Sequence, residues 1–209
     1  MGGIANISYH RDGQFTAFDV CPANRVLNLL VEPLGKAYDD AGAIASGGVV
    51  HPELLQALNA LAYYRQAPPK SLANDFGTDL VFPLIKKYDL PVADALCTMV
   101  EHIAWQLSRA VSGPEPDARL PESGAGAMPM LVTGGGAFNH YLVERIAALL
   151  TPHGVAPFVA ESGLVQYKEA IIMALLGVLR WREEYNALAS VTGAARNTIN
   201  GALWLGGEA

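Results

Sequence analysis

The stretch MLVTGGGAFN, residues 130–139, joins a short apolar run to three consecutive glycines and then to a segment with helical spacing. Residues 130–133 predict a buried strand, and residues 137–150 place apolar side chains at helical intervals. Glycines between a strand and a helix let a ligand approach the backbone and face the helix N-terminus. A tight turn is the simpler alternative, because the stretch matches neither the Walker pattern nor the GxGxxG dinucleotide fingerprint.

The segments on either side of this stretch predict an α/β fold. A further strand at 155–160 and a long buried helix at 167–184 continue a strand, helix, strand, helix order, which is typical of a parallel sheet covered by helices. Near the N-terminus, residues 4–9 and 15–20 alternate in polarity around turn residues 11–14, which predicts a hairpin. We expect this hairpin to extend the sheet that contains the two later strands.

Further helices and loops follow from apolar spacing and from breaker residues. The apolar spacing predicts helices at 24–34, with Asn24 as a candidate N-cap, at 51–62, and at 91–111, the clearest of the three. Residues 38–48 are rich in Asp, Ala, Gly and Ser and are interpreted as a loop. Gly, Pro, Glu, Ala and Ser dominate residues 112–129, which predicts a flexible surface loop.

Composition and charge exclude several classes of protein. The chain has 209 residues, 51% of them hydrophobic and 16% charged, so disorder over most of its length is excluded. Its net charge of −6 argues against a nucleic-acid binder, because such affinity comes from clustered Lys and Arg. The cysteines, Cys21 and Cys97, lack partners at metal spacing, so neither a zinc site nor a disulfide scaffold is expected.

The location of the protein is predicted from what its sequence lacks. The longest apolar stretch, residues 170–179, is short of the roughly 18 to 20 residues that span a bilayer, so no membrane association is expected. The chain opens without the charged and apolar regions of a secretory signal. We therefore expect a cytoplasmic protein.

A second candidate site lies in FDVCPAN, residues 18–24, where Asp19 comes near the end of the second predicted strand. A carboxylate in that place can act as a general base or as a partner of magnesium. The alternative is an aspartate that caps a turn before Pro22. The opening glycines of GGIAN, residues 2–6, are a weak signal when taken alone.

In their order along the chain, these runs resemble the anhydro-N-acetylmuramic acid kinases, of the superfamily of actin and the sugar kinases. One departure is Val20-Cys21, where the commoner family form has Thr-Gly. The matching motifs are GGIAN at 2–6, FDVCPAN at 18–24, YDDAG at 38–42, PPKSLANDFG at 68–77, VTGGGAFN at 132–139, KEA at 168–170 and SVTGA at 190–194.

The resemblance implies an actin-like, ribonuclease H-like lobe with a mixed sheet flanked by helices. Similar proteins have two such lobes, and they use ATP and Mg²⁺ to open the 1,6-anhydro ring of the sugar with water and to phosphorylate O6. Residues 1–209 would form the second, C-terminal lobe. The N-terminal lobe, with its phosphate loop, is expected to be absent.

The same resemblance assigns roles to individual residues. Asp19 would take a proton from the attacking water, and Glu169 and Asn24 would contact the sugar. A surface glutamate and a helix cap are the alternatives for the latter two, while Lys70 and His102 are interpreted as structural. No residue is assigned to a metal. The residues assigned to the nucleotide are Gly2, Gly3, Gly134, Gly135 and Gly136.

Two functions therefore remain open at this stage. The first is a sugar kinase of cell-wall recycling, with a small-molecule sugar as partner and a homodimer left open. The second is a shortened, non-catalytic family member that binds nucleotide or sugar, because phosphoryl transfer needs a loop that cradles the phosphates. An unrelated actin-like ATPase or N-acetylhexosamine kinase is a third, weaker alternative, against which YDDAG and PPKSLANDFG argue.

Overall fold

The chain begins with the antiparallel hairpin that the sequence predicts. A computed structural model describes residues 1–11, 13–112, 127–204 and 206. Strand β1 (Ile4–Arg11) pairs with β2 (Gln14–Pro22), in a register that runs from Ile4 opposite Pro22 to Arg11 opposite Gln14. The pairing is irregular between Ala5 and Asn6. The inner end of the hairpin is buried, with Ala5 and Cys21 fully covered.

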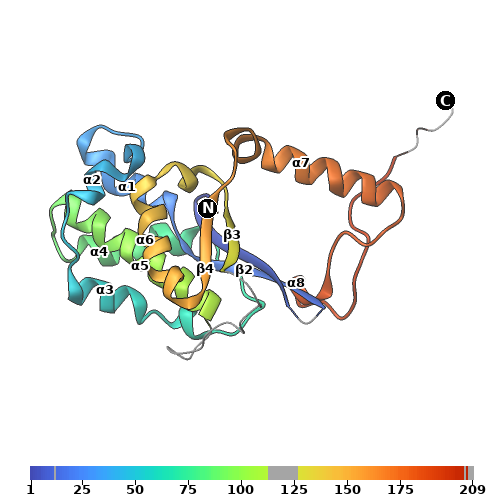
Figure 1. The fold of residues 1–209 in the computed structure, drawn as a ribbon, viewed down its shortest axis with the longest axis horizontal. Coiled ribbons are helices and arrows are strands. Elements are labelled where there is room, and N and C mark those ends of the chain that lie inside the picture. The colour runs from blue at the N-terminus through green and yellow to red at the C-terminus, as the bar shows by residue number, and fades with distance from the viewer. Residues whose placement is uncertain (12, 113–126, 205, 207–209) are drawn as a thin grey trace.

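One long helix, α5 (Val92–Ser112), forms the centre of the helical layer (Figure 1). Its apolar stripe is buried, and α1 (Asn24–Val31), α3 (Pro52–Asn59) and α6 (His140–Leu150) pack against it. The helices predicted at 24–34, 51–62 and 91–111 are therefore confirmed, with shorter limits for the first two. Fully buried side chains in this layer include Leu54, Leu96, Met99, Ile103, Leu142 and Ile146.

Residues 38–48 are more helical than expected, and one aspartate explains why. The Asp39 carboxylate accepts hydrogen bonds from the backbone N–H groups of Ile44 (2.8 Å) and Ala45 (2.9 Å). These bonds satisfy N–H groups at the start of a helix. The short helical segments are the 3₁₀ turns Glu32–Leu34, Asp40–Gly42, Ala62–Arg65, Gly135–Phe138 and Thr151–His153, α2 (Ala43–Ser46), the π-helix Phe76–Val81, α4 (Phe82–Lys86) and α8 (Ala189–Thr192).

The second sheet is a parallel pair, as the strand and helix order predicts. Strands β3 (Met128–Val132) and β4 (Val155–Val159) are joined through α6 and pair from Met128 opposite Val155 onward. The fold class α/β is thus confirmed, and it is consistent with an actin-like lobe. Of the predicted loop 112–129, Ser112 ends α5 and residues 128–129 belong to β3, whereas residues 113–126 lie outside the described part.

The expectation that the hairpin joins this sheet is wrong. In the described chain, β1 and β2 form one two-stranded sheet, and β3 and β4 form another. Met1 lies where the two sheets approach each other: its amino group donates to the Thr133 carbonyl, and its own carbonyl accepts from Gly136 N (3.0 Å). Residues of β1, β2, β3 and β4 also line a common cavity, so the sheets face a shared space and form no ladder.

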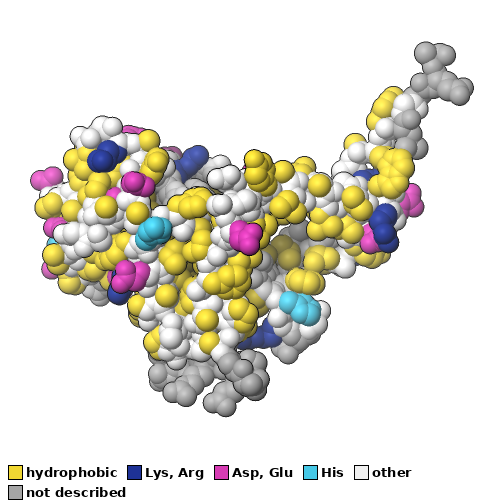
Figure 2. All heavy atoms as spheres, turned by 45° about the horizontal axis from the view of Figure 1, so that its top comes forward, with side chains coloured by type: hydrophobic (Ala, Val, Ile, Leu, Met, Phe, Trp, Pro, Cys, Tyr) yellow, Lys and Arg dark blue, Asp and Glu magenta, His cyan; other side chains and the backbone are white. Residues whose placement is uncertain are grey.

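The long C-terminal helix is exposed, which contradicts the prediction of a buried helix. Helix α7 (Ser162–Trp181) projects from the body of the molecule (Figures 1 and 2). Of its side chains, only Val165 is buried. Met173 is 67% exposed and Trp181 is 66% exposed. Apolar composition alone does not imply burial, and this helix is apolar on sides that no described element covers.

Length and composition alone make α7 long and apolar enough to cross a membrane. The sequence-based estimate missed this because it counted only residues 170–179, while the helix begins at Ser162. One helix of this kind is weak evidence for a membrane protein, and the expected lack of membrane association stays a prediction.

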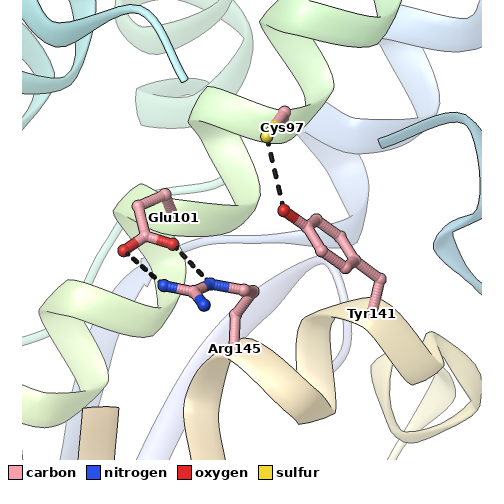
Figure 3. A network of polar contacts seen from close by, with 4 residues as sticks. All are labelled: Cys97, Glu101, Tyr141 and Arg145. Carbon is pink, nitrogen blue, oxygen red and sulfur yellow. Dashed lines mark hydrogen bonds and ion pairs between the residues drawn. The ribbon is translucent and has the colours of Figure 1, made fainter. Parts of the chain in front are cut away.

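Two polar clusters tie α5 to its neighbours. Arg145 of α6 donates to both carboxylate oxygens of Glu101 (2.8 and 3.2 Å), and the Tyr141 hydroxyl lies 3.4 Å from Cys97 Sγ (Figure 3). Burial and the Cys97 contact raise the pKa of Tyr141 to about 12. Both contacts join α5 to α6, so they stabilise the layer that supports β3 and β4.

The second cluster is centred on His102, which is packed as expected and fully buried. Its Nδ1 donates to Asn59 Oδ1 (2.7 Å), because an amide oxygen can only accept, and its Nε2 therefore accepts from the Tyr64 hydroxyl (2.9 Å). Burial lowers the pKa of His102 from 6.5 to about 3. The histidine is thus a neutral tether between α5, α3 and the turn Ala62–Arg65.

We expect stability to fall with acidification because His102 must stay neutral in the folded chain. The unfolded chain takes up the proton below pH 6.5, so this contribution is complete above pH 6.5 and is lost as the pH falls toward about 3. Urea unfolding at a series of pH values should show a shallower decline for His102→Gln than for the unmodified chain. The exposed His140→Gln should leave the slope unchanged, and an equal slope in all three proteins would contradict this prediction.

Candidate functional site

The first residues bring together three segments that are far apart in the sequence. Gly3 O accepts from Ala23 N (2.8 Å), and Gly2 O accepts from Asn24 N (3.1 Å). Met1 O accepts from Gly136 N (3.0 Å). The opening glycines therefore lie between the start of α1 and the glycine turn after β3. The structure thus brings Gly2, Gly3, Asn24 and the glycine turn into one place.

Two of the three consecutive glycines are needed by the chain itself. Gly134 has a φ of +80°, and a Cβ there would lie 2.6 Å from Met1 O. A Cβ on Gly136 would lie 2.9 Å from Met1 Cβ. Gly135 is exposed, and a Cβ on it would meet only the Asn24 amide nitrogen at 3.3 Å. Of the three, Gly135 is the one with backbone open to a ligand.

The glycines do not lead directly into a helix N-terminus as expected. They pass into the 3₁₀ turn Gly135–Phe138, and α6 begins only at His140. The side chain of Asn139 caps α6 by accepting from Leu142 N (2.9 Å). A buried side chain therefore already satisfies part of that helix terminus.

Asn24 is the first residue of α1 and not its N-cap, which corrects the sequence prediction. Ala23 holds the cap position and makes no side-chain cap bond. The backbone explains this, because the N–H groups of Asn24 and Arg25 at the start of the helix are already bound to the carbonyls of Gly2 (3.1 Å) and Gly3 (3.4 Å). The Asn24 amide is left free to lie against the turn at Gly135 and Gly136. Its role toward a sugar stays a prediction.

Asp19 is held by a segment far away in sequence. Its Oδ2 accepts from Leu72 N (2.9 Å), its N–H donates to Lys70 O (3.2 Å), and its carbonyl accepts from the Tyr63 hydroxyl. Within the described chain, Oδ1 has no hydrogen-bond partner. Asp19 does not cap a turn. One carboxylate oxygen is fixed, and the other is available for chemistry.

A cavity of about 850 Å³ lies beside Asp19, within the usual size of a small-molecule site. Residues from both sheets, α5 and α7 line it. Met1 and Thr133 also line it, so the glycine turn borders the cavity through these residues. Glu169 is exposed on α7 and is not among the lining residues, although its neighbour Lys168 is. Its assignment to the sugar stays a prediction.

Lys70, which the sequence predicts to be a structural loop lysine, lines this cavity together with Asp19. Its Nζ lies 4.6 Å from the centre of the Tyr63 ring and donates to Tyr63 O at 3.4 Å. Burial lowers the pKa of the Lys70 ammonium. The sequence signal that could have indicated it is its place in PPKSLANDFG, the segment that also supplies Leu72 N.

The residues present fit a bound nucleotide and magnesium only in a limited way. Gly2 and Gly3 are exposed, and a Cβ on Gly2 would meet no atom within 4 Å, so the backbone is open there and at Gly135. Among the residues described, no group of three or more His, Cys, Asp or Glu side chains could hold a metal. Mg²⁺ is often bound by one or two carboxylates together with phosphate oxygens. Asp19 is the carboxylate that the cavity offers.

Comparison with known proteins gives a consistent result. A sequence profile described as anhydro-N-acetylmuramic acid kinase matches residues 1–206. Curated relatives of that name include one from Gloeobacter violaceus, 36% identical over 94% of this chain and 52% of its own length. Others come from a Cyanothece species (34%, over 97% and 55%) and from Burkholderia ambifaria (33%, over 98% and 53%). The chain spans about half the length of the curated relatives it matches.

Proposed function

The chain belongs to the anhydro-N-acetylmuramic acid kinase family, and from this premise we propose that it forms the carboxylate-bearing lobe of an ATP-dependent sugar kinase. The reaction would convert 1,6-anhydro-N-acetylmuramic acid and water to N-acetylmuramic acid 6-phosphate in cell-wall recycling. The observation that carries the proposal is Asp19, which lines the cavity with one fixed and one unpaired carboxylate oxygen.

Asp19 would act as the general base of ring opening. Its Oδ1 takes a proton from a water molecule while the water oxygen attacks the anomeric carbon. The bond from that carbon to O6 breaks, and O6 becomes the acceptor of the phosphoryl group that bound ATP supplies. The bond from Leu72 N to Oδ2 would keep the carboxylate in one orientation during proton transfer.

The nucleotide would lie along the open backbone of Gly2, Gly3 and Gly135. Glycine at these places removes the side chain that would separate a ligand from the backbone N–H groups. Gly134 and Gly136 would act indirectly, by allowing Met1 to dock beside the turn. Magnesium would bind together with the phosphates of the nucleotide, and Asp19 is the carboxylate in the cavity that could coordinate it.

Replacing Gly135 with valine is expected to weaken ATP binding by about tenfold or more, because the new side chain would fill the exposed side of the turn. Calorimetry would measure the dissociation constant, and thermal unfolding would verify the fold. Gly163→Val is the control, since a Cβ at Gly163 meets no atom within 4 Å. If Gly135→Val bound ATP with unchanged affinity, the assignment of the nucleotide to this turn would be contradicted.

Turnover of the purified 209-residue chain tests the proposed function. The chain is incubated with ATP, Mg²⁺ and the anhydro-sugar, and mass spectrometry detects the 6-phosphate. A non-catalytic binding member is the second candidate, favoured by the fact that the chain spans about half of its relatives. Binding of ATP and sugar without product would support that candidate, and product would exclude it. A cytoplasmic location, a sugar partner and independence of nucleic acid and membrane belong to the same proposal.

A further inference from the structure

The charge of the cavity is opposite in sign to that of the whole chain. The chain carries a net charge of −6, yet among the described residues the charged side chains lining the cavity are Arg11, Lys70 and Lys168 against one carboxylate, Asp19. A concave site lined mainly by one sign of charge raises the local concentration of ligands of the opposite sign. The cavity is therefore suited to an anionic ligand.

Lys70 is the cation most closely tied to Asp19. Residues 70–72 run beside β2, so that Lys70 O accepts from Asp19 N (3.2 Å) and Leu72 N donates to Asp19 Oδ2 (2.9 Å). The Lys70 ammonium rests over the Tyr63 and Phe18 rings, at 4.6 and 5.7 Å from their centres. These rings, with the segment 70–72, hold the ammonium at the wall of the cavity.

The ammonium of Lys70 is incompletely satisfied. An ammonium has three N–H donors, and within the described chain its side-chain hydrogen bond is the 3.4 Å contact with Tyr63 O. It forms no ion pair with any described carboxylate. Partial burial makes an unpaired charge costly, as the lowered pKa of Lys70 reflects. A ligand anion would supply the missing partner.

We propose that Lys70 determines substrate specificity by pairing with the carboxylate of the sugar acid. The inference rests on the proposed function, in which the anomeric carbon of the sugar lies at Asp19. Muramic acid differs from glucosamine by an ether-linked lactic acid, and this group carries the carboxylate. Lys70 lies on the segment that also holds Asp19 in place. Its ammonium can therefore pair with this carboxylate while Asp19 acts on the sugar ring.

A phosphate of the nucleotide is the other anion with matching chemistry, and Lys168 is better placed for it. Burial, and secondarily the charge of Lys168, lower the pKa of the Met1 amino group to about 6. Lys168 is thus close enough to Met1 to influence it, and Met1 docks on the glycine turn assigned to the nucleotide. Within this proposal, Lys70 therefore serves the sugar and Lys168 serves the nucleotide.

Calorimetry on the 209-residue chain tests this division with three probes: 1,6-anhydro-N-acetylmuramic acid, its neutral counterpart 1,6-anhydro-N-acetylglucosamine, and ATP. The unmodified chain should bind the acid about 10- to 100-fold more tightly than the neutral sugar, as expected for a charge-assisted pair. Lys70→Met should remove most of that ratio and change the ATP dissociation constant less than about threefold. Lys70→Arg should retain part of it, and Lys36→Met, at an exposed lysine, should change nothing.

The outcomes separate this inference from the proposed function. Equal affinity for the two sugars in the unmodified chain would overturn the role of Lys70 without any variant, while turnover of the acid would still support the kinase. Loss of ATP affinity alone in Lys70→Met would assign the lysine to a phosphate and overturn the inference. Failure of the chain to bind either sugar would contradict the sugar site itself, and with it both proposals for this chain.

Discussion

Asp19→Asn is expected to lower the rate of ring opening by about 10²- to 10⁴-fold and to leave ATP affinity unchanged. Asparagine keeps the size of the side chain, and its oxygen can still accept from Leu72 N. What it lacks is the second oxygen that would take the proton from water. The effect is therefore expected in kcat and not in the fold.

Steady-state turnover would measure this effect, either in the 209-residue chain or in a chimera that adds the part of the Gloeobacter violaceus relative that this chain does not match. Asp75→Asn, an exposed aspartate in the same PPKSLANDFG segment, is the matched control and should keep the full rate. An Asp19→Asn protein that retains most of its activity would show that another carboxylate activates the water.

Gly134→Ala is expected to have the largest effect on stability, about 3 to 5 kcal/mol of unfolding free energy. At a φ of +80° and a ψ of 173°, the backbone is in a region that glycine alone adopts readily. In addition, the new Cβ would lie 2.6 Å from Met1 O, so Met1 must move. The loss combines backbone strain with the undocking of the first residue.

Gly154→Ala provides a matched comparison. Gly154 has a φ of +75°, but a Cβ there would meet no atom within 4 Å, so only the left-handed backbone is penalised. Its expected cost is about 1 kcal/mol. Urea unfolding of both variants measures the difference. If both variants lost the same unfolding free energy, moving Met1 away from the glycine turn would cost nothing. The site would then not depend on the position of Met1.

The elements that the sequence predicts well are those whose residue pattern is local and regular. Helix α5 repeats its apolar residues at helical spacing, and the two strands of the hairpin flank a recognisable turn, so both elements are visible in the sequence. The strands β3 and β4 were found for the same reason. Their boundaries moved by only a few residues.

The features that were mispredicted depend on contacts between distant segments. Whether the hairpin joins β3 depends on where Met1 lies, and no local pattern contains that information. Helix α7 is as apolar as a buried helix, and composition cannot say whether another element covers it. Asn24 looks like an N-cap, but the carbonyls of Gly2 and Gly3 already take the N–H groups at this helix start.

The candidate site also contains some residues that the sequence predicts and others that it does not. Asp19 and the glycine turn lie in motifs that suggested them; Asp19 lines the cavity, and the turn is linked to it through Met1. Lys70 and Lys168 were missed because a surplus of positive charge exists only after the chain folds around a common space. The charge of a single lysine in an acidic sequence gives no local signal, although the place of Lys70 in PPKSLANDFG could have indicated it.

The docking of Met1 on Thr133 also sets an order for folding during synthesis. The two residues are 132 positions apart, so this contact cannot form until the ribosome has released the glycine turn. At roughly 5 to 20 residues per second, the N-terminal segment would remain undocked for on the order of ten seconds. Its apolar residues are exposed over that interval, so slower growth or chaperone binding at this stage should raise the yield of folded protein.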